Sequence, residues 1–159
     1  MPNDTALRKQ LIALLRGGQA HARFDAAVKG FPSDRIGLRP EGAPHSAWEL
    51  LEHMRIAQSD ILQFSKSAKH VSPPWPEGYW PAAPAPKRKT QWNESVKAFR
   101  ADLAAFEKLV LNPKKDLHEP FPWGDGQTLL REALLIADHN AYHLGQLVLV
   151  RRLLGAWEG

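Results

Sequence analysis

The chain has 159 residues, of which 43% are hydrophobic and 24% charged, so it is long enough to bury a core of its own. It contains no cysteine, which excludes disulfides, thiolate metal sites and a cysteine nucleophile. The formal net charge is +4, but the basic residues are scattered, which disfavours nucleic acid as a partner. These values are typical of one globular domain, which we expect to cover residues 1–159.

No apolar stretch approaches the roughly 20 residues that span a bilayer. Residues 1–5 also lack the basic segment and apolar stretch of a signal peptide. We therefore expect a cytoplasmic protein without a membrane partner.

Apolar residues at helical spacing predict two helices in the first half of the chain. The first runs from about Thr5 to Lys29, and Gly17-Gly18 is a weak point that favours a bend in it. The second begins at Ser46, which has the spacing of a capping box with Glu49, and continues to about Ala68.

Two further helices are predicted in the second half. One begins after Thr90 and stops at Asn112-Pro113. The last follows Gly126-Gln127-Thr128 and runs to about Leu154, with Gly155 just past its end. Its apolar residues fall nearly all round the helix, so we expect part of it to form a homodimer interface. Four amphipathic helices without strand alternation predict an all-α protein, most simply a four-helix bundle.

A long loop over residues 71–89 contains six prolines and the aromatic residues Trp75, Tyr79 and Trp80. Loops of this length are uncommon in compact domains and often have a function. Two interpretations stand side by side. The segment is a strap whose tryptophans plug one end of the bundle, or an aromatic wall over a pocket, and both could hold.

Three of the seven histidines are candidate metal ligands. His139 and His143 are four residues apart on one buried helical face, so both imidazoles can reach one ion. His53 lies on the inward face of the second predicted helix, and facing helices of a bundle often share a metal. The alternative, that these are hydrogen-bonded core histidines, stays open on spacing alone. Without cysteine, the metal would be zinc, nickel, iron or manganese.

The other polar residues nearby give weaker indications. Asn140 stands where a zinc peptidase has its glutamate base, which argues against peptidase activity. Glu49 could serve the metal as a base or a hydrogen-bond partner, but capping is the favoured role, and Asp138 points to the surface. For His21 we expect packing near Phe24 rather than metal ligation. No role is assigned to three further histidines: His45, His70 and His118.

The segments 46–53, SAWELLEH, and 138–146, DHNAYHLGQ, in this order resemble the DinB/YfiT-like family, whose members are regarded as metal-dependent enzymes. The resemblance covers nearly the whole chain. It implies a four-helix bundle with an up-down-down-up course, commonly found as a dimer. It also implies that His53, His139 and His143 hold one divalent transition metal, with zinc or nickel favoured over iron or manganese.

Members of this family include thiol-dependent transferases and proteins described as hydrolases, so the resemblance implies a small-molecule substrate and, for a transferase, a low-molecular-weight thiol. Three histidines leave an open position at which a metal lowers the pKa of water or a thiol. The alternative is a non-catalytic dimeric bundle that binds a metal or senses a ligand. Neither the residues nor the resemblance defines the catalytic residues.

Overall fold

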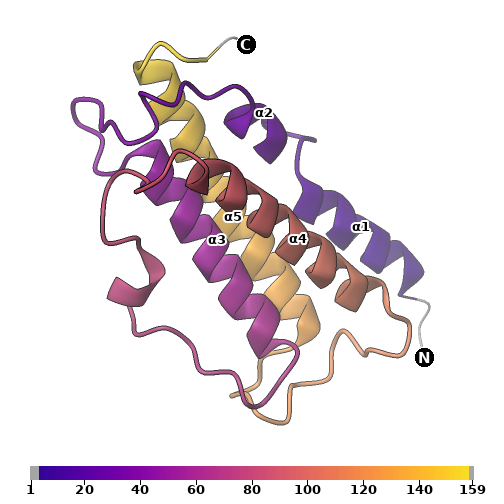
Figure 1. The fold of residues 1–159 in the computed structure, drawn as a ribbon. Coiled ribbons are helices and arrows are strands. Elements are labelled where there is room, and N and C mark those ends of the chain that lie inside the picture. Colours follow the sequence, from indigo (N-terminus) through magenta and orange to yellow (C-terminus); the bar gives the residue numbers. More distant parts are fainter. Residues whose placement is uncertain (1–3, 158–159) are drawn as a thin grey trace.

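The computed structural model describes residues 4–157, which are all-α (Figure 1). The helices in chain order are α1 (Thr5–Arg16), α2 (Phe24–Val28), α3 (Ala47–Phe64), the short 3-10 helix η1 (Glu77–Tyr79), α4 (Gln91–Leu111) and α5 (Leu129–Leu153). Within the described range no strand forms, and pairing of extended backbone is limited to one isolated bridge between Pro120 and Thr128. The predicted all-α class is confirmed.

The four long helices α1, α3, α4 and α5 lie side by side (Figure 1). Helix α3 packs against α4 and α5, and α1 packs against the same two helices. The chain runs in one sense along α1 and α5 and in the opposite sense along α3 and α4 (Figure 1). Helices α3 and α5 are therefore antiparallel neighbours, although the segments between them hold α4 and two long loops.

The prediction of one continuous first helix is wrong. Helix α1 ends at Arg16, and a separate short helix, α2, begins at Phe24. The cause is the glycine pair, because Gly17 has φ 63° and Gly18 has φ 82°. Two successive residues in the left-handed region end a right-handed helix, and glycine adopts that region without steric cost.

Helix α3 begins as the sequence predicts. The Glu49 backbone N–H donates to the Ser46 hydroxyl at 3.2 Å, and the Ser46 N–H donates to the Glu49 carboxylate at 2.8 Å. This reciprocal pair is the predicted capping box, and it fixes the start of the helix that carries His53. The helix ends at Phe64, earlier than the predicted end near Ala68.

Helices α4 and α5 agree closely with their predicted limits. At the start of α5, the Thr128 hydroxyl accepts from the Arg131 N–H at 3.1 Å. At its end, Gly155 has φ 64°, the left-handed conformation predicted for the residue that follows a helix. These two ends place the long, unbroken α5 that carries His139 and His143.

The core consists of two apolar clusters with a polar layer between them. One cluster surrounds the first half of α3 and the last part of α5, and the other surrounds the end of α3 and the first half of α5. Between them, the buried Gln58 side chain donates to the Phe99 carbonyl at 2.8 Å and accepts from the Asn140 amide at 2.9 Å. His53 on α3 and His139 and His143 on α5 also lie close together between the two clusters.

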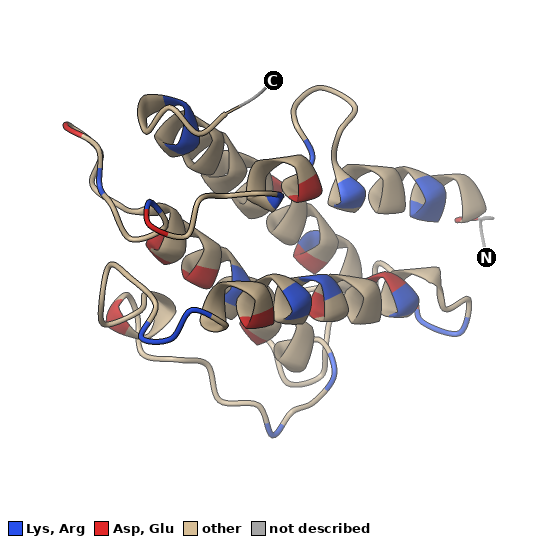
Figure 2. Ribbon diagram, turned by 45° about the horizontal axis from the view of Figure 1, so that its top comes forward, with Lys and Arg blue, Asp and Glu red and all other residues tan. Residues whose placement is uncertain are grey.

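Lysine and arginine residues are distributed over all four long helices and several loops, and acidic residues lie among them (Figure 2). In the part of the chain that the structure describes, every helix is too short or too polar to pass through a lipid bilayer.

The N-cap of α3 leads to a first prediction. We expect Ser46→Ala to lower the free energy of unfolding by about 1–2 kcal/mol, because it removes the cap and the hydrogen bond from the Ser46 hydroxyl to the Pro84 carbonyl. Urea-induced unfolding of both proteins measures the difference. The exposed Ser33→Ala serves as the control, with an expected change below about 0.5 kcal/mol. Equal effects of the two substitutions would contradict the role of the cap.

Candidate metal centre

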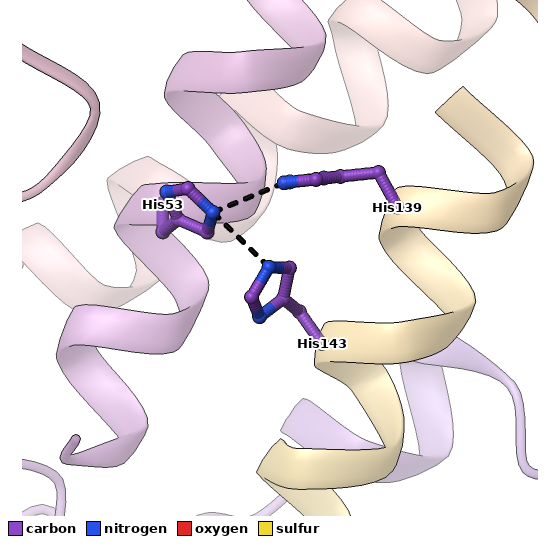
Figure 3. A group of neighbouring side chains, drawn as sticks. All are labelled: His53, His139 and His143. Carbon is purple, nitrogen blue, oxygen red and sulfur yellow. Dashed lines mark hydrogen bonds between the residues drawn. The ribbon is translucent and has the colours of Figure 1, made fainter. Parts of the chain in front are cut away.

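The structure brings together the three histidines that the sequence singled out (Figure 3). Helix α3 supplies His53, and two successive turns of α5 supply His139 and His143. The Nε2 atom of His53 lies 3.0 Å from Nε2 of His139 and 3.1 Å from Nε2 of His143. All three candidate ligand atoms lie within 4.8 Å of one another.

The outer nitrogens of two of these rings already have partners. Nδ1 of His53 lies 2.9 Å from the Tyr79 carbonyl oxygen, and Nδ1 of His143 lies 2.8 Å from the Gln146 amide oxygen. Both partners accept hydrogen bonds, so both Nδ1 atoms carry the proton. A neutral imidazole has one N–H, and the facing Nε2 atoms of His53 and His143 therefore present lone pairs to each other.

A cation between these nitrogens would remove their repulsion. Metal–nitrogen bonds of about 2.0–2.1 Å in tetrahedral geometry separate the nitrogens by roughly 3.3 Å. The observed separations of 3.0 and 3.1 Å are close to that value. The donors are imidazoles alone, a set that suits zinc, nickel or iron better than calcium or magnesium. The residues present thus fit a divalent transition metal.

Burial keeps these imidazoles neutral. His53 and His143 are buried, and His139 is half-buried. Burial lowers the pKa of all three rings, and the neighbouring His143 and His53 contribute to lowering the pKa of His139 to about 4. Near neutral pH the rings are therefore in the form that binds metal ions.

An aromatic wall closes one side of the cluster. The Trp80 ring lies flat on the His53 ring, with centroids 3.9 Å apart and planes 2° apart. His45 stacks on the indole of Trp80 at 4.0 Å, so the indole contacts both imidazoles. On the α5 side, the Tyr142 ring meets His143 edge-on at 4.8 Å. These contacts hold the ligand rings in place and exclude water from one face of His53.

Comparison with known protein families matches residues 6–147 to the DinB superfamily. The chain belongs to this superfamily. No curated protein and no solved structure matches the chain. The match includes the two segments on which the resemblance was based, and with them every histidine of the cluster.

In this DinB superfamily member, the loop over residues 71–89 brings Trp80 to the histidine cluster. Trp80 stacks on His53, and it also packs against the apolar core. Trp75 is 76% exposed, so this tryptophan does not plug an end of the bundle. Tyr79 contributes its main-chain carbonyl, a group that no residue pattern could have indicated.

The secondary candidates are also placed. The Glu49 carboxylate binds the Arg39 guanidinium and the Ser46 N–H, and it caps α3 as favoured. Burial opposes its charge, but these partners outweigh burial and lower its pKa. Its oxygens are therefore engaged, which does not suit a base. Asp138 is exposed, as expected.

The remaining histidines differ in their surroundings. His21 lies beside the same hollow as Phe24, but it is exposed in the connection between α1 and α2 and does not face the core, because the helix breaks before it. His118 is exposed in a loop. His45 stacks on Trp80 beside the cluster, and His70 binds Asp60 on α3. Sequence reasoning missed these contacts because both histidines lie in loops, whose course helix periodicity does not predict.

A pocket of about 270 Å³ adjoins the cluster. Its wall is mostly apolar and includes Leu50, Leu149 and Val150, while His45 and Gln146 supply polar groups. The Gln146 amide is the partner of His143, so one side chain contacts both the pocket and a candidate ligand.

A second prediction concerns metal binding and stability. We expect Zn²⁺ or Ni²⁺ at about a hundredfold excess over its Kd to stabilise the metal-free protein by roughly 2.7 kcal/mol, or about 5–10 °C in Tm. Thermal unfolding with and without a chelator measures this shift. His143→Ala should lose it, while the exposed control His118→Ala should retain it. An equal shift in the two variants would mean that metal binds elsewhere.

Proposed function

We propose that the chain is a metal-dependent enzyme that acts on a small molecule, as a thiol-dependent transferase or a hydrolase, with the metal held by His53, His139 and His143. The observation that carries this proposal is the convergence of three Nε2 atoms, two of which have no proton because their rings donate through Nδ1. Membership of the DinB superfamily supports it.

The surrounding residues have definable tasks in such a reaction. When bound, a divalent metal on three imidazoles supplies an open coordination position that lowers the pKa of a water or a thiol. The Tyr79 carbonyl and the Gln146 amide oxygen orient the His53 and His143 rings so that Nε2 faces the site. Trp80 covers one face of the His53 ring, so a substrate would reach the site from a side that Trp80 does not cover.

The adjoining pocket supports a small-molecule substrate. Its volume of about 270 Å³ and its apolar wall suit a compact apolar group, with His45 and Gln146 available as hydrogen-bonding partners. Along the described ribbon, acidic residues lie among the lysine and arginine residues, a mixture that disfavours nucleic acid as a partner (Figure 2).

The metal itself follows from donor chemistry. Three neutral imidazoles favour zinc or nickel, with iron or manganese as further candidates. A low-molecular-weight thiol is the co-substrate in the transferase version of the proposal, because the chain contains no cysteine that could supply the sulfur.

A third prediction tests the enzyme proposal. Purified protein should contain about one transition metal ion per chain and His139→Ala much less, as measured by elemental analysis. Metal-loaded protein is then screened against esters and amides, and against electrophiles with and without small thiols. Turnover without thiol identifies a hydrolase, and turnover that requires thiol identifies a transferase. Bound metal without turnover in either screen would favour the non-catalytic alternative.

We further propose that α5 forms a homodimer interface. Its outward face carries the exposed apolar side chains Leu134, Tyr142, Leu149 and Leu153. Gly145 lies on the same face with open space above it. A second copy of α5, related by a two-fold axis near Gly145, would cover this stripe with the same stripe of its partner, which is how isologous dimers form.

A fourth prediction follows. Light scattering should give twice the mass of one chain, and Leu149→Glu combined with Leu153→Glu should reduce it to a single chain, because two charges would enter the apolar contact. The control is Leu38→Glu, which alters a similarly exposed leucine outside α5 and should leave the dimer intact. A monomeric parent protein would refute the interface.

A further inference from the structure

The main-chain carbonyl that accepts from His53 lies in the loop between α3 and α4, and contacts of that loop with α3 determine its position. The carbonyl belongs to Tyr79, the last residue of η1. The hydroxyl of the same Tyr79 donates to the Asp60 carboxylate at 2.7 Å. The other carboxylate oxygen of Asp60 lies 2.6 Å from Nε2 of His70, just beyond the end of α3.

The two contacts of Tyr79 lie on the same side of α3. Asp60 follows His53 by seven residues, close to two helical turns, so both side chains project from one face about 10 Å apart along the axis. Tyr79 therefore contacts α3 at two levels, with its carbonyl at His53 and its hydroxyl at Asp60. Its phenol ring bridges the distance between them.

Trp80, the residue after η1, stacks on His53 and His45, and Ser72 bonds to the Tyr79 hydroxyl. Other residues of this segment are exposed. Trp75 contacts the Tyr79 ring but is itself 76% exposed. Glu77, at the start of η1, is also exposed.

Two side chains of α3, His53 and Asp60, bond to Tyr79. Among the described residues, Ser46 at the cap of α3 also bonds to this loop, because its hydroxyl donates to the Pro84 carbonyl beyond η1. Among the side chains of η1, the Tyr79 hydroxyl is therefore the group that forms a hydrogen bond to α3.

We propose that Tyr79 and Asp60 are positioning residues of the metal centre: their hydrogen bond fixes the carbonyl that holds the His53 ring with Nε2 facing the other two histidines. This inference rests on the metal site proposed above. Without the hydroxyl, the segment keeps the stacking of Trp80 but loses the bond from Tyr79 to Asp60, so the carbonyl that accepts from Nδ1 of His53 is held less firmly. The ring then spends less time in the tautomer and rotamer that bind metal.

The test uses Co²⁺, whose visible absorption reports the ligand geometry. We expect Tyr79→Phe to weaken Co²⁺ binding by roughly tenfold and to change the visible spectrum, because loss of such outer hydrogen bonds weakens metal sites. The metal-free protein should melt at nearly the parent temperature, since the ring contact with Trp75 remains.

A matched control separates positioning from general loss of stability. Trp123 also lies in a loop, and its indole N–H donates to the Phe64 carbonyl at the end of α3, at 2.9 Å. Trp123→Phe removes that bond, keeps a ring stacked on Phe121 and leaves the histidine cluster untouched. Its Co²⁺ affinity and spectrum should equal those of the parent.

Asp60→Ala provides a second route to the same bond, because alanine has no acceptor for the Tyr79 hydroxyl. If Asp60 acts through Tyr79, then Asp60→Ala alone weakens Co²⁺ binding, and the double variant is weaker by less than the product of the single effects. Parent-like affinity and spectrum in Tyr79→Phe, or in Asp60→Ala should the first variant not fold, would overturn this inference and leave the metal site standing. A parent protein that binds no Co²⁺ would overturn both.

Discussion

The structure depends on one electrostatic constraint: three imidazole nitrogens point at one another in the middle of a helical bundle. The rings of His53 and His143 donate through Nδ1, so their Nε2 atoms meet as lone pairs 3.1 Å apart. Unpaired polar atoms are costly in an interior of low dielectric. A cation bound there would satisfy all three nitrogens at once. The surrounding groups keep the three rings facing one another.

The bundle accommodates this group by separating its apolar core into two clusters. The intervening layer also holds Gln58 and Asn140, which bond to each other and, through Gln58, to the backbone of α4. Among the described residues, Oδ1 of Asn140 is a further buried side-chain atom without a hydrogen-bond partner. Polar groups in a core fix the register of the helices around them, because a shifted helix would leave several unpaired. The layer therefore sets how α3 and α5 align.

Much of this architecture could be predicted from local patterns. Three predictions needed only the pattern of a single helix, and the structure confirms them. They are the placement of His139 and His143 on one face of α5, the capping box at Ser46 and the glycine after α5. The contact between His53 and α5 required the family resemblance, because helix periodicity does not say which helices are neighbours. The Tyr79 carbonyl and the stacking of His45 could not be predicted, because every residue has a carbonyl and the path of a proline-rich loop depends on tertiary contacts.

The separation of the ligands along the chain has a further consequence. His53 precedes His139 by 86 residues, a span that includes the proline-rich loop and all of α4. An ion held by both would act as a covalent staple does, closing a large ring in the denatured chain. By the loop-entropy relation for cross-links, such a ring removes roughly 4–5 kcal/mol of chain entropy. In a polypeptide without cysteine, an ion between two helices is thus a means of tying distant parts of the backbone together.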